Sequence, residues 1–318
     1  MAETKEIAVN SSGRKALAPR SSRRSRRSGP RRSQTVGALW AAPALIMVAI
    51  FFVLPVIYMV YMSFQNWPLL GEHTFVGLRN YTDALQDPRF LEPVKFTLVY
   101  TLLIVPALLV AGLGMASLVK AKRRGSGLFR TLFFLPVVVG FAAAGYLWLW
   151  FVNPRVGPLP QILRDLGFGT LQDPWLGTTS GALLVVCLMV LWKFSGFTML
   201  LFMTGMQTIP DDIVEAARVD GAGRWRMLRS ITLPLLRRTI ALVVILTTAG
   251  SLLAFDQFFV MTRGGPNNHT ITVVYAIYRQ SFSSFRLGYG AALSVMLALV
   301  LLVISAIQLR LLRSDDDD

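Results

Sequence analysis

Apolar residues in this chain gather in six long runs that are separated by polar stretches. Each run approaches or exceeds the roughly 20 residues that an α-helix needs to cross a bilayer. The runs cover residues 37–61, 96–119, 128–151, 181–206, 239–255 and 290–309. This pattern predicts an all-α, polytopic protein that crosses the lipid bilayer six times.

Shorter features are expected between and within these runs. A short amphipathic helix is predicted over residues 82–85, with Pro88 and Pro93 as helix breakers. A second is predicted from the helical spacing of apolar residues over 160–166. Pro136 should kink the third run, because a proline removes one backbone hydrogen bond from a helix.

Composition agrees with a membrane protein and argues against disulfide and metal sites. Of the 318 residues, 54% are hydrophobic and only 15% are charged, and the mean hydropathy is +0.54. These values lie outside the range of ordinary globular domains. The single cysteine, Cys187, allows neither an internal disulfide nor a cysteine metal site. His73 and His269 lie in different polar stretches, so we expect no metal site there.

Lysine and arginine are distributed unevenly among the polar stretches. Residues 1–36 carry ten, 120–130 carry five, 207–238 carry six and 310–318 carry two, whereas the three remaining stretches carry eight together. Because cytoplasmic loops are enriched in these residues, both termini and the 207–238 loop are expected on the cytoplasmic side. The net charge of +15 is mostly a signal of this topology.

The polar stretches also set the expected domain boundaries. Residues 1–36 are rich in Arg, Ser, Gly and Pro, which predicts a disordered, basic cytoplasmic tail. Its expected role is to retain the N-terminus inside, with attraction to anionic lipid second, and no nucleic-acid binding is expected. The first helix and its outward loop should follow over 37–95, a core of five helices over 96–310, and a cytoplasmic tail over 311–318.

The 207–238 loop contains the most informative motif of the chain. Pro210 and the two acidic residues after it favour a helix start, since proline fits a first turn and acids there complement the helix dipole. The sequence E-A-A-R-V-D-G follows over 215–221, and I-T-L-P follows over 231–234. Adjacent alanines let another backbone approach closely, so we expect this helix to contact another protein.

The spacing of E-A-A, three residues, G, nine residues and I-x-L-P resembles the coupling loop of permease subunits in bacterial ATP-binding-cassette (ABC) importers. Other short motifs resemble carbohydrate-type importer permeases, the class that includes maltose and glycerol-3-phosphate systems. These motifs are A-P-A over 42–44, L-P over 54–55 and 135–136, and G-G-P over 264–266 before the aromatic stretch 270–278. The resemblance covers about residues 39–312 and implies the type I permease fold of ABC importers.

The resemblance further implies that this loop seats in a cleft of a separate ATPase. Glu215 is expected to form a charge-assisted bond with a basic residue of that ATPase. The basic aromatic stretch 224–229 is expected to lie at the lipid headgroups. The expected ATPase-coupling residues are Glu215, Ala216, Ala217, Asp220, Gly221, Arg224, Leu233 and Pro234.

Partners and location follow from the same resemblance. It implies a second, homologous but different permease, a dimeric ATP-binding subunit and an extracytoplasmic solute-binding protein, in the bacterial cytoplasmic membrane. The chain has no G-x-x-x-x-G-K-[ST] loop, and no Gly is followed by Lys. We therefore expect ATP and Mg²⁺ on the partner ATPase and no cofactor on this chain. No Ser, His and acid constellation indicates an enzyme.

A few polar residues in or beside the apolar runs are candidates for a solute pathway. Lys193 lies within the fourth run, where an isolated charge is costly and normally faces a cavity or a partner. It is either structural, paired with a carboxylate such as Asp256 or with carbonyls, or it lines the pathway. The stretch 256–258 combines polar and aromatic groups, which suits sugar binding or the capping of the fifth span. The candidate pathway residues are Trp192, Lys193, Ser195, Asp256, Gln257 and Phe258.

The function expected is import of a sugar or related polyol, with this chain forming half of the translocation pathway. The same architecture could import glycerol-3-phosphate or a glycerophosphodiester. An alternative of another class is a proton-coupled secondary transporter that uses Lys193 and Asp256. That alternative leaves the E-A-A spacing unexplained, and six spans without evident inverted repeats do not favour it.

Overall fold

The computed structural model describes residues 32–119, 125–167 and 175–313. The predicted N-terminal tail up to residue 31, the basic residues 120–124 and the end of the C-terminal tail lie outside the described residues. The chain divides into two units, Met1–Leu54 and Pro55–Asp318. In the first unit, helix α1 (Arg32–Val48) continues through a π-helical turn (Ala49–Val53).

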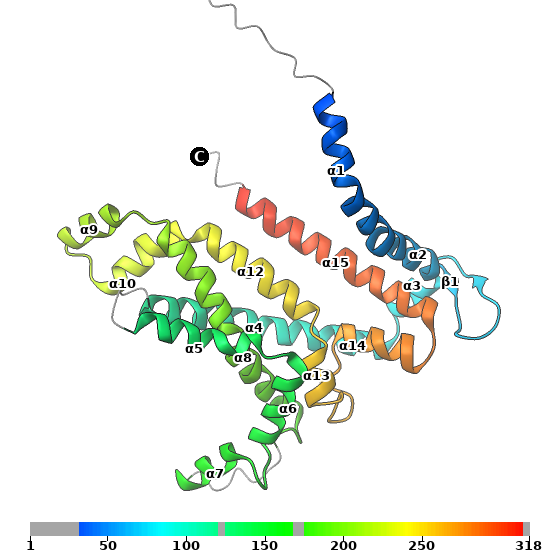
Figure 1. Cartoon of the computed structure of the whole chain (residues 1–318). Helices are drawn as coiled ribbons and strands as arrows, with labels where there is room; N and C mark the ends of the chain where they lie inside the picture. Colours follow the sequence, from blue (N-terminus) through cyan, green and yellow to red (C-terminus); the bar gives the residue numbers. More distant parts are fainter. Residues whose placement is uncertain (1–31, 120–124, 168–174, 314–318) are drawn as a thin grey trace, which may run out of the picture. The chain divides into compact units, whose positions relative to one another are not determined.

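The second unit is built almost entirely of helices (Figure 1). Its first part contains α2 (Leu54–Ser63), β1 (Gln65–Asn66), β2 (Thr74–Phe75), α3 (Arg79–Ala84), α4 (Pro88–Val119), α5 (Ser126–Val138), α6 (Phe141–Phe151) and α7 (Pro158–Asp165). Its second part contains α8 (Thr179–Gln207), α9 (Asp211–Val219), α10 (Arg224–Met227), α11 (Leu233–Leu235), α12 (Arg237–Leu252), α13 (Asp256–Met261), α14 (Val273–Tyr278) and α15 (Leu287–Arg313). Two π-helical turns, Leu228–Thr232 and Arg279–Ser283, lie between these helices.

Four described helices are long and apolar enough to cross a membrane. They are Trp40–Ser63, Pro88–Val119, Thr179–Gln207 and Leu287–Arg310. Two further candidates are bent pairs: α5 and α6 meet at 100°, and the segment Arg224–Leu235 meets α12 at 73°. The described chain therefore has six candidate spans when each bent pair is taken as one span, which agrees with the six apolar runs.

The third run is broken two residues after its proline. Helix α5 includes Pro136 and ends at Val138, and Gly140 then precedes the first residue of α6. Three consecutive valines, residues 137–139, stand before that glycine, and β-branched side chains lose rotamer freedom in a helix. The sequence therefore predicted a kink in this run correctly but placed it at the wrong residue.

The expectation that Pro88 and Pro93 act as helix breakers is correct for Pro88, which stands at the boundary between α3 and α4, and wrong for Pro93. Pro88 is the first residue of α4, because a proline has no amide hydrogen and the first turn of a helix needs none. Pro93 lies inside α4, where the Thr97 hydroxyl donates to its carbonyl (2.8 Å) and accepts a bond from the Val273 amide (2.9 Å). The short helix before Pro88 begins at Arg79, three residues before its predicted start.

The core of the second unit lies where α8 meets α4, α5 and α12 (Figure 1). Small residues allow these helices to approach closely, as is common between membrane helices. A Cβ added to Gly112 of α4 would meet Thr198 of α8, and one added to Gly205 of α8 would meet Thr239 of α12. Close packing around α8 positions the cavity described below.

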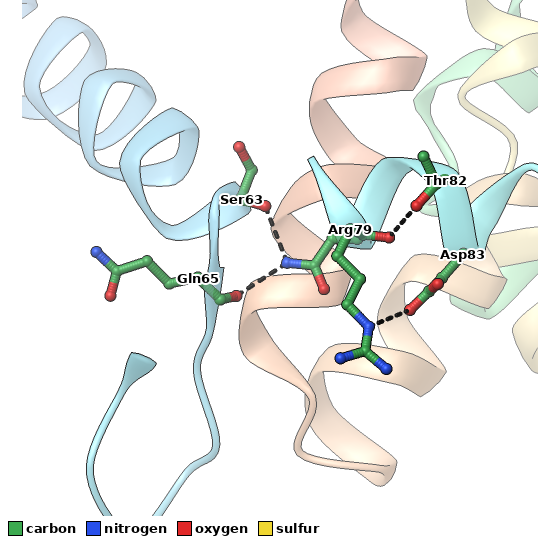
Figure 2. A network of polar contacts seen from close by, with 6 residues as sticks. Ser63, Gln65, Arg79, Thr82 and Asp83 are labelled. Atoms are coloured by element: carbon green, nitrogen blue, oxygen red, sulfur yellow. Dashed lines mark hydrogen bonds and ion pairs between the residues drawn. The ribbon is translucent and has the colours of Figure 1, made fainter. Parts of the chain in front are cut away.

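A buried asparagine joins α3 to the end of α2 and to β1, and Figure 2 shows its two acceptor residues, Ser63 and Gln65, near Arg79 and Asp83. Asn80 donates to the backbone carbonyls of Ser63 and Gln65, both at 2.9 Å. Beside it, the exposed Arg79 and Asp83 form an ion pair of 3.9 Å. Because carbonyls at the end of α2 and in β1 share one amide group, α3 is fixed against both elements.

Candidate functional site

Helix α9 carries the E-A-A motif and is short, as expected. Asp211 and Asp212 occupy its first turn, after Pro210. Glu215 and Ala216 are exposed, whereas Ala217 is buried and Val214 packs on a core cluster of α4, α8 and α12. The two alanines therefore have different surroundings: Ala217 is packed within this chain, and Ala216 is open to another molecule.

Gly221 ends α9 in a way that requires glycine. The Ala222 amide donates to the Ala217 carbonyl (2.9 Å), and the Gly221 amide donates to the Arg218 carbonyl (3.0 Å). This pair of bonds is the Schellman motif, whose central residue adopts a left-handed backbone. Gly221 has φ of +75°, a value that residues with a Cβ rarely adopt.

The chain after Gly221 returns to the bundle through a basic, exposed segment. Arg224 opens α10, and Trp225 is 72% exposed. A cavity of about 710 Å³ lies between α9 and this segment and is lined by Glu215, Arg218, Arg224 and Trp225, among others.

The I-T-L-P segment anchors the far end of the same loop. Leu233 is half-buried, and Pro234 is exposed in α11. Leu236 then enters the core cluster that also contains Val243. The loop is therefore held at both ends, while Asp220 and Glu215 stay exposed.

Lys193 is paired with backbone carbonyls. The residue is only 3% exposed. Its Nζ donates to the carbonyls of Pro136 (3.3 Å), Val137 (3.2 Å) and Val139. Among the described residues it forms no ion pair with Asp256, which is exposed in the first turn of α13. Of the two structural pairings that the sequence allowed, the carbonyl pairing is the one present.

A partly open space of about 180 Å³ lies among α4, α6, α8, α12 and the start of α13. Its lining combines aromatic rings with hydroxyl and amide groups. The polar and aromatic lining residues include Tyr100, Phe141, Phe194, Thr247, Ser251 and Gln257. The Gln257 amide donates to the Tyr100 hydroxyl at 3.3 Å. We call this space the central cavity.

Of the six candidate pathway residues, Gln257 lines the central cavity. Trp192 packs against Trp148, with ring centroids 6.2 Å apart. Ser195 is half-buried, and its carbonyl accepts a bond from the Thr198 hydroxyl at 2.9 Å. Phe258 is fully buried and meets Tyr100 edge to face at 5.1 Å. Ser195 and Phe258 therefore contact lining residues, Thr198 and Tyr100, without lining the cavity themselves.

Sequence reasoning missed most of the cavity lining. Thr247 and Ser251 lie four residues apart in the fifth apolar run, so both fall on one face of α12. This spacing of hydroxyl groups could have predicted a polar stripe on that face of the helix. Tyr100 and Phe141 offered no comparable signal, because aromatic residues are common in membrane helices.

Comparison with known proteins decides the family. Residues 89–314 match the family described as the inner membrane component of binding-protein-dependent transport systems. This chain belongs to that family. It is a permease component of an ABC transporter and a multi-pass protein of the inner membrane, and it is not the ATPase. The predicted family and fold class are confirmed.

Individual relatives of the permease cover most of its length. It is 34% identical to the multiple sugar-binding transport system permease protein MsmF of Streptococcus mutans, over 84% of this chain and 91% of the relative. It is 36% identical to the sn-glycerol-3-phosphate transport system permease protein UgpA of Agrobacterium fabrum, over 86% of this chain and 92% of the relative. A crystal structure of a bacterial ABC transporter involved in alginate import shares the fold, with a TM-score of 0.79 and 21% identity. The match covers 90% of this chain and 97% of the chain in that structure.

Metal ligands do not gather in the described part of the permease. Within residues 32–119, 125–167 and 175–313, no group of three or more His, Cys, Asp or Glu side chains could hold a metal ion. No cofactor is indicated for this family of permeases.

Proposed function

We propose that the permease forms half of the pathway by which an ABC importer moves a sugar or related polyol. The observation that carries this proposal is the central cavity, where the Tyr100, Phe141 and Phe194 rings stand beside Gln257, Thr247 and Ser251. Aromatic faces and amide or hydroxyl groups together suit a polyhydroxylated solute. The name of the relative MsmF refers to sugars, which favours the same solute class.

Glycerol-3-phosphate or a glycerophosphodiester is the second candidate for the solute. The name of the relative UgpA supports it. However, no charged group is among the residues that line the central cavity. A phosphate would need a basic partner there, so the neutral solute is preferred.

The distribution of Lys and Arg favours an orientation with both termini and α9 in the cytoplasm. In this orientation the exposed face of α9, with Glu215, Ala216 and Asp220, is available to a dimeric ATPase. Leu233 and Pro234 then carry the movement of α9 into α12. The solute-binding protein would dock on the opposite, extracytoplasmic side.

A proton-coupled mechanism is less well supported. It would require Lys193 and Asp256 to exchange a proton along one path. Lys193 instead contacts three backbone carbonyls, and Asp256 is exposed on a different helix. Membership of a binding-protein-dependent family also favours ATP as the energy source.

The partner permease is expected to be a different chain. The resemblance to carbohydrate-type importers implies two unlike permeases on one ATPase dimer. Mass measurement of the detergent-purified complex should therefore find one copy of this 35.2 kDa chain together with one homologous chain. A complex with two copies of this chain and no homologue would contradict the expectation.

Solute class can be tested on the soluble partner. We expect the solute-binding protein of this importer to gain thermal stability with a neutral oligosaccharide such as maltotriose. A ligand that binds only the folded state of a protein raises its melting temperature. Glycerol-3-phosphate, an anion, and glycerophosphocholine, a zwitterionic phosphodiester, serve as the phosphate-containing probes. If these two probes stabilise the binding protein and no neutral sugar or polyol in a panel does, the solute is a phosphate compound and the preference for a neutral solute is wrong.

A further inference from the structure

The break between α5 and α6 leaves backbone carbonyls without helical partners. The last carbonyls of any helix have no amide within that helix to bond. At the end of α5, only the Val139 amide turns back, to the Pro136 carbonyl at 3.2 Å. The Gly140 carbonyl is used by the Ala144 amide of α6 (2.9 Å). Inside a membrane, the remaining carbonyls must be satisfied by another part of the protein.

Lys193 supplies that partner from α8. A lysine ammonium has three N–H donors, and here it meets three carbonyls, those of Pro136, Val137 and Val139. Its positive charge also lies at the carboxyl end of α5, where the helix dipole favours a cation. Because all three donors have acceptors on this chain, none is left over for a solute.

Gly196 allows α5 and α8 to come close enough for this contact. It lies three residues after Lys193, on the same side of α8. A Cβ at this position would collide with the Phe133 carbonyl of α5. Lys193 and Gly196 therefore both serve the contact between α5 and α8. Lys193 caps the end of α5, and Gly196 leaves room for the two helices to approach.

The ammonium also lies against two rings of the cavity wall. Its Nζ is 5.0 Å from the centre of the Phe141 ring and 5.5 Å from that of Phe194. Phe141 is the first residue of α6, so its place depends directly on the break. Both rings line the central cavity, whereas Lys193 itself does not.

We propose that Lys193 is a positioning residue, which caps the broken span and thereby sets the Phe141 and Phe194 wall of the central cavity. The inference depends on the proposed function at one point, because it takes the central cavity as the solute pathway. Lys193 thus affects transport through the shape of the cavity and makes no bond to the solute.

Amide hydrogen exchange on the purified transporter tests the cap without any solute. In Lys193→Met, we expect amides of residues 137–145 to exchange about tenfold faster, since a local opening no longer breaks three bonds to the ammonium. Amides of α12 should keep their rates. Gly196→Ala should reproduce the effect, and Lys193→Arg, which keeps charge and donors, should restore most of the protection. Thr204→Val, at an exposed position of the same helix, is the matched control.

Uptake measurements on the same variants separate the possible outcomes. Loss of uptake in Lys193→Met with unchanged exchange over 137–145 would mean that Lys193 binds solute, and the inference would fall. Faster exchange throughout all helices would assign it a general role in stability and would also overturn the inference. If a further variant that fills the central cavity, Gly250→Phe, leaves uptake normal while Lys193→Met still raises exchange over 137–145, the cap stands and the proposed solute site fails.

Discussion

Replacing Gly221 by valine is expected to lower uptake by about tenfold or more while the chain still inserts into the membrane. At φ of +75°, a residue with a Cβ costs about 1–2 kcal/mol, and a β-branched residue is especially disfavoured. Helix α9 has only nine residues, too few to be stable without its ends fixed. The strain should therefore unravel its last turn and displace Glu215 and Ala216 from the contact with the ATPase that we propose for them. Uptake and the amount of co-purified ATPase measure the effect.

Gly223 provides the control for this substitution. It lies two residues away in the same exposed loop, and like Gly221 it has no heavy atom within 4 Å of an added Cβ. Its φ of −66° is open to any residue. Gly223→Val adds the same side chain without the strain, so it should retain most uptake. Equal activity of both variants at the level of the unmodified transporter would rule out the proposed role of the α9 end.

Replacing Gly250 by phenylalanine is expected to reduce uptake by about 100-fold, because the added ring would occupy the proposed pathway at the central cavity, whose volume is only about 180 Å³. Gly250 lies on α12 at the cavity, and no heavy atom lies within 4 Å of its added Cβ. The ring can therefore enter the cavity without pushing the backbone. Assembly with the ATPase should be unchanged, which distinguishes a blocked pathway from a damaged complex.

Gly114→Phe is the matched control for the cavity. Gly114 is exposed on α4, also with no neighbour within 4 Å of an added Cβ, and it does not line the central cavity. The same gain in size is therefore placed on a helix surface, where uptake should persist. Should Gly250→Phe transport as well as Gly114→Phe, the solute must follow another route.

Local chemistry made the helices and the α9 loop predictable from the sequence. Long apolar runs identify membrane helices because the bilayer fixes their length and allows no unpaired backbone. The ends of α9 depend on residues beside it in the chain, namely Pro210 and Gly221, so both ends could be predicted. The family spacing in that loop is a second local signal, and it pointed to the correct family.

The central cavity and the partner of Lys193 depended on packing between distant parts of the chain. Tyr100 and Gln257 are separated by 157 residues and still share a hydrogen bond. The acceptors of Lys193 exist only because α5 ends at Val138, two residues beyond the proline that suggested a kink. No local sequence pattern predicts the break or the close approach of α8 at Gly196. The sequence therefore could not decide whether Lys193 pairs with a carboxylate or with carbonyls.

The bend between α5 and α6 gives the third span a mechanical property that a continuous helix lacks. Val139 and Gly140 lie outside both helices, so rotation about their torsions can swing α6 and leave the hydrogen-bond ladder within each helix intact. A straight helix would have to break such bonds to bend as far. The stiffness of this joint is therefore set from outside, by the contacts of α6 with α8 and α13. A single substitution in either neighbour could loosen or lock the third span without touching it.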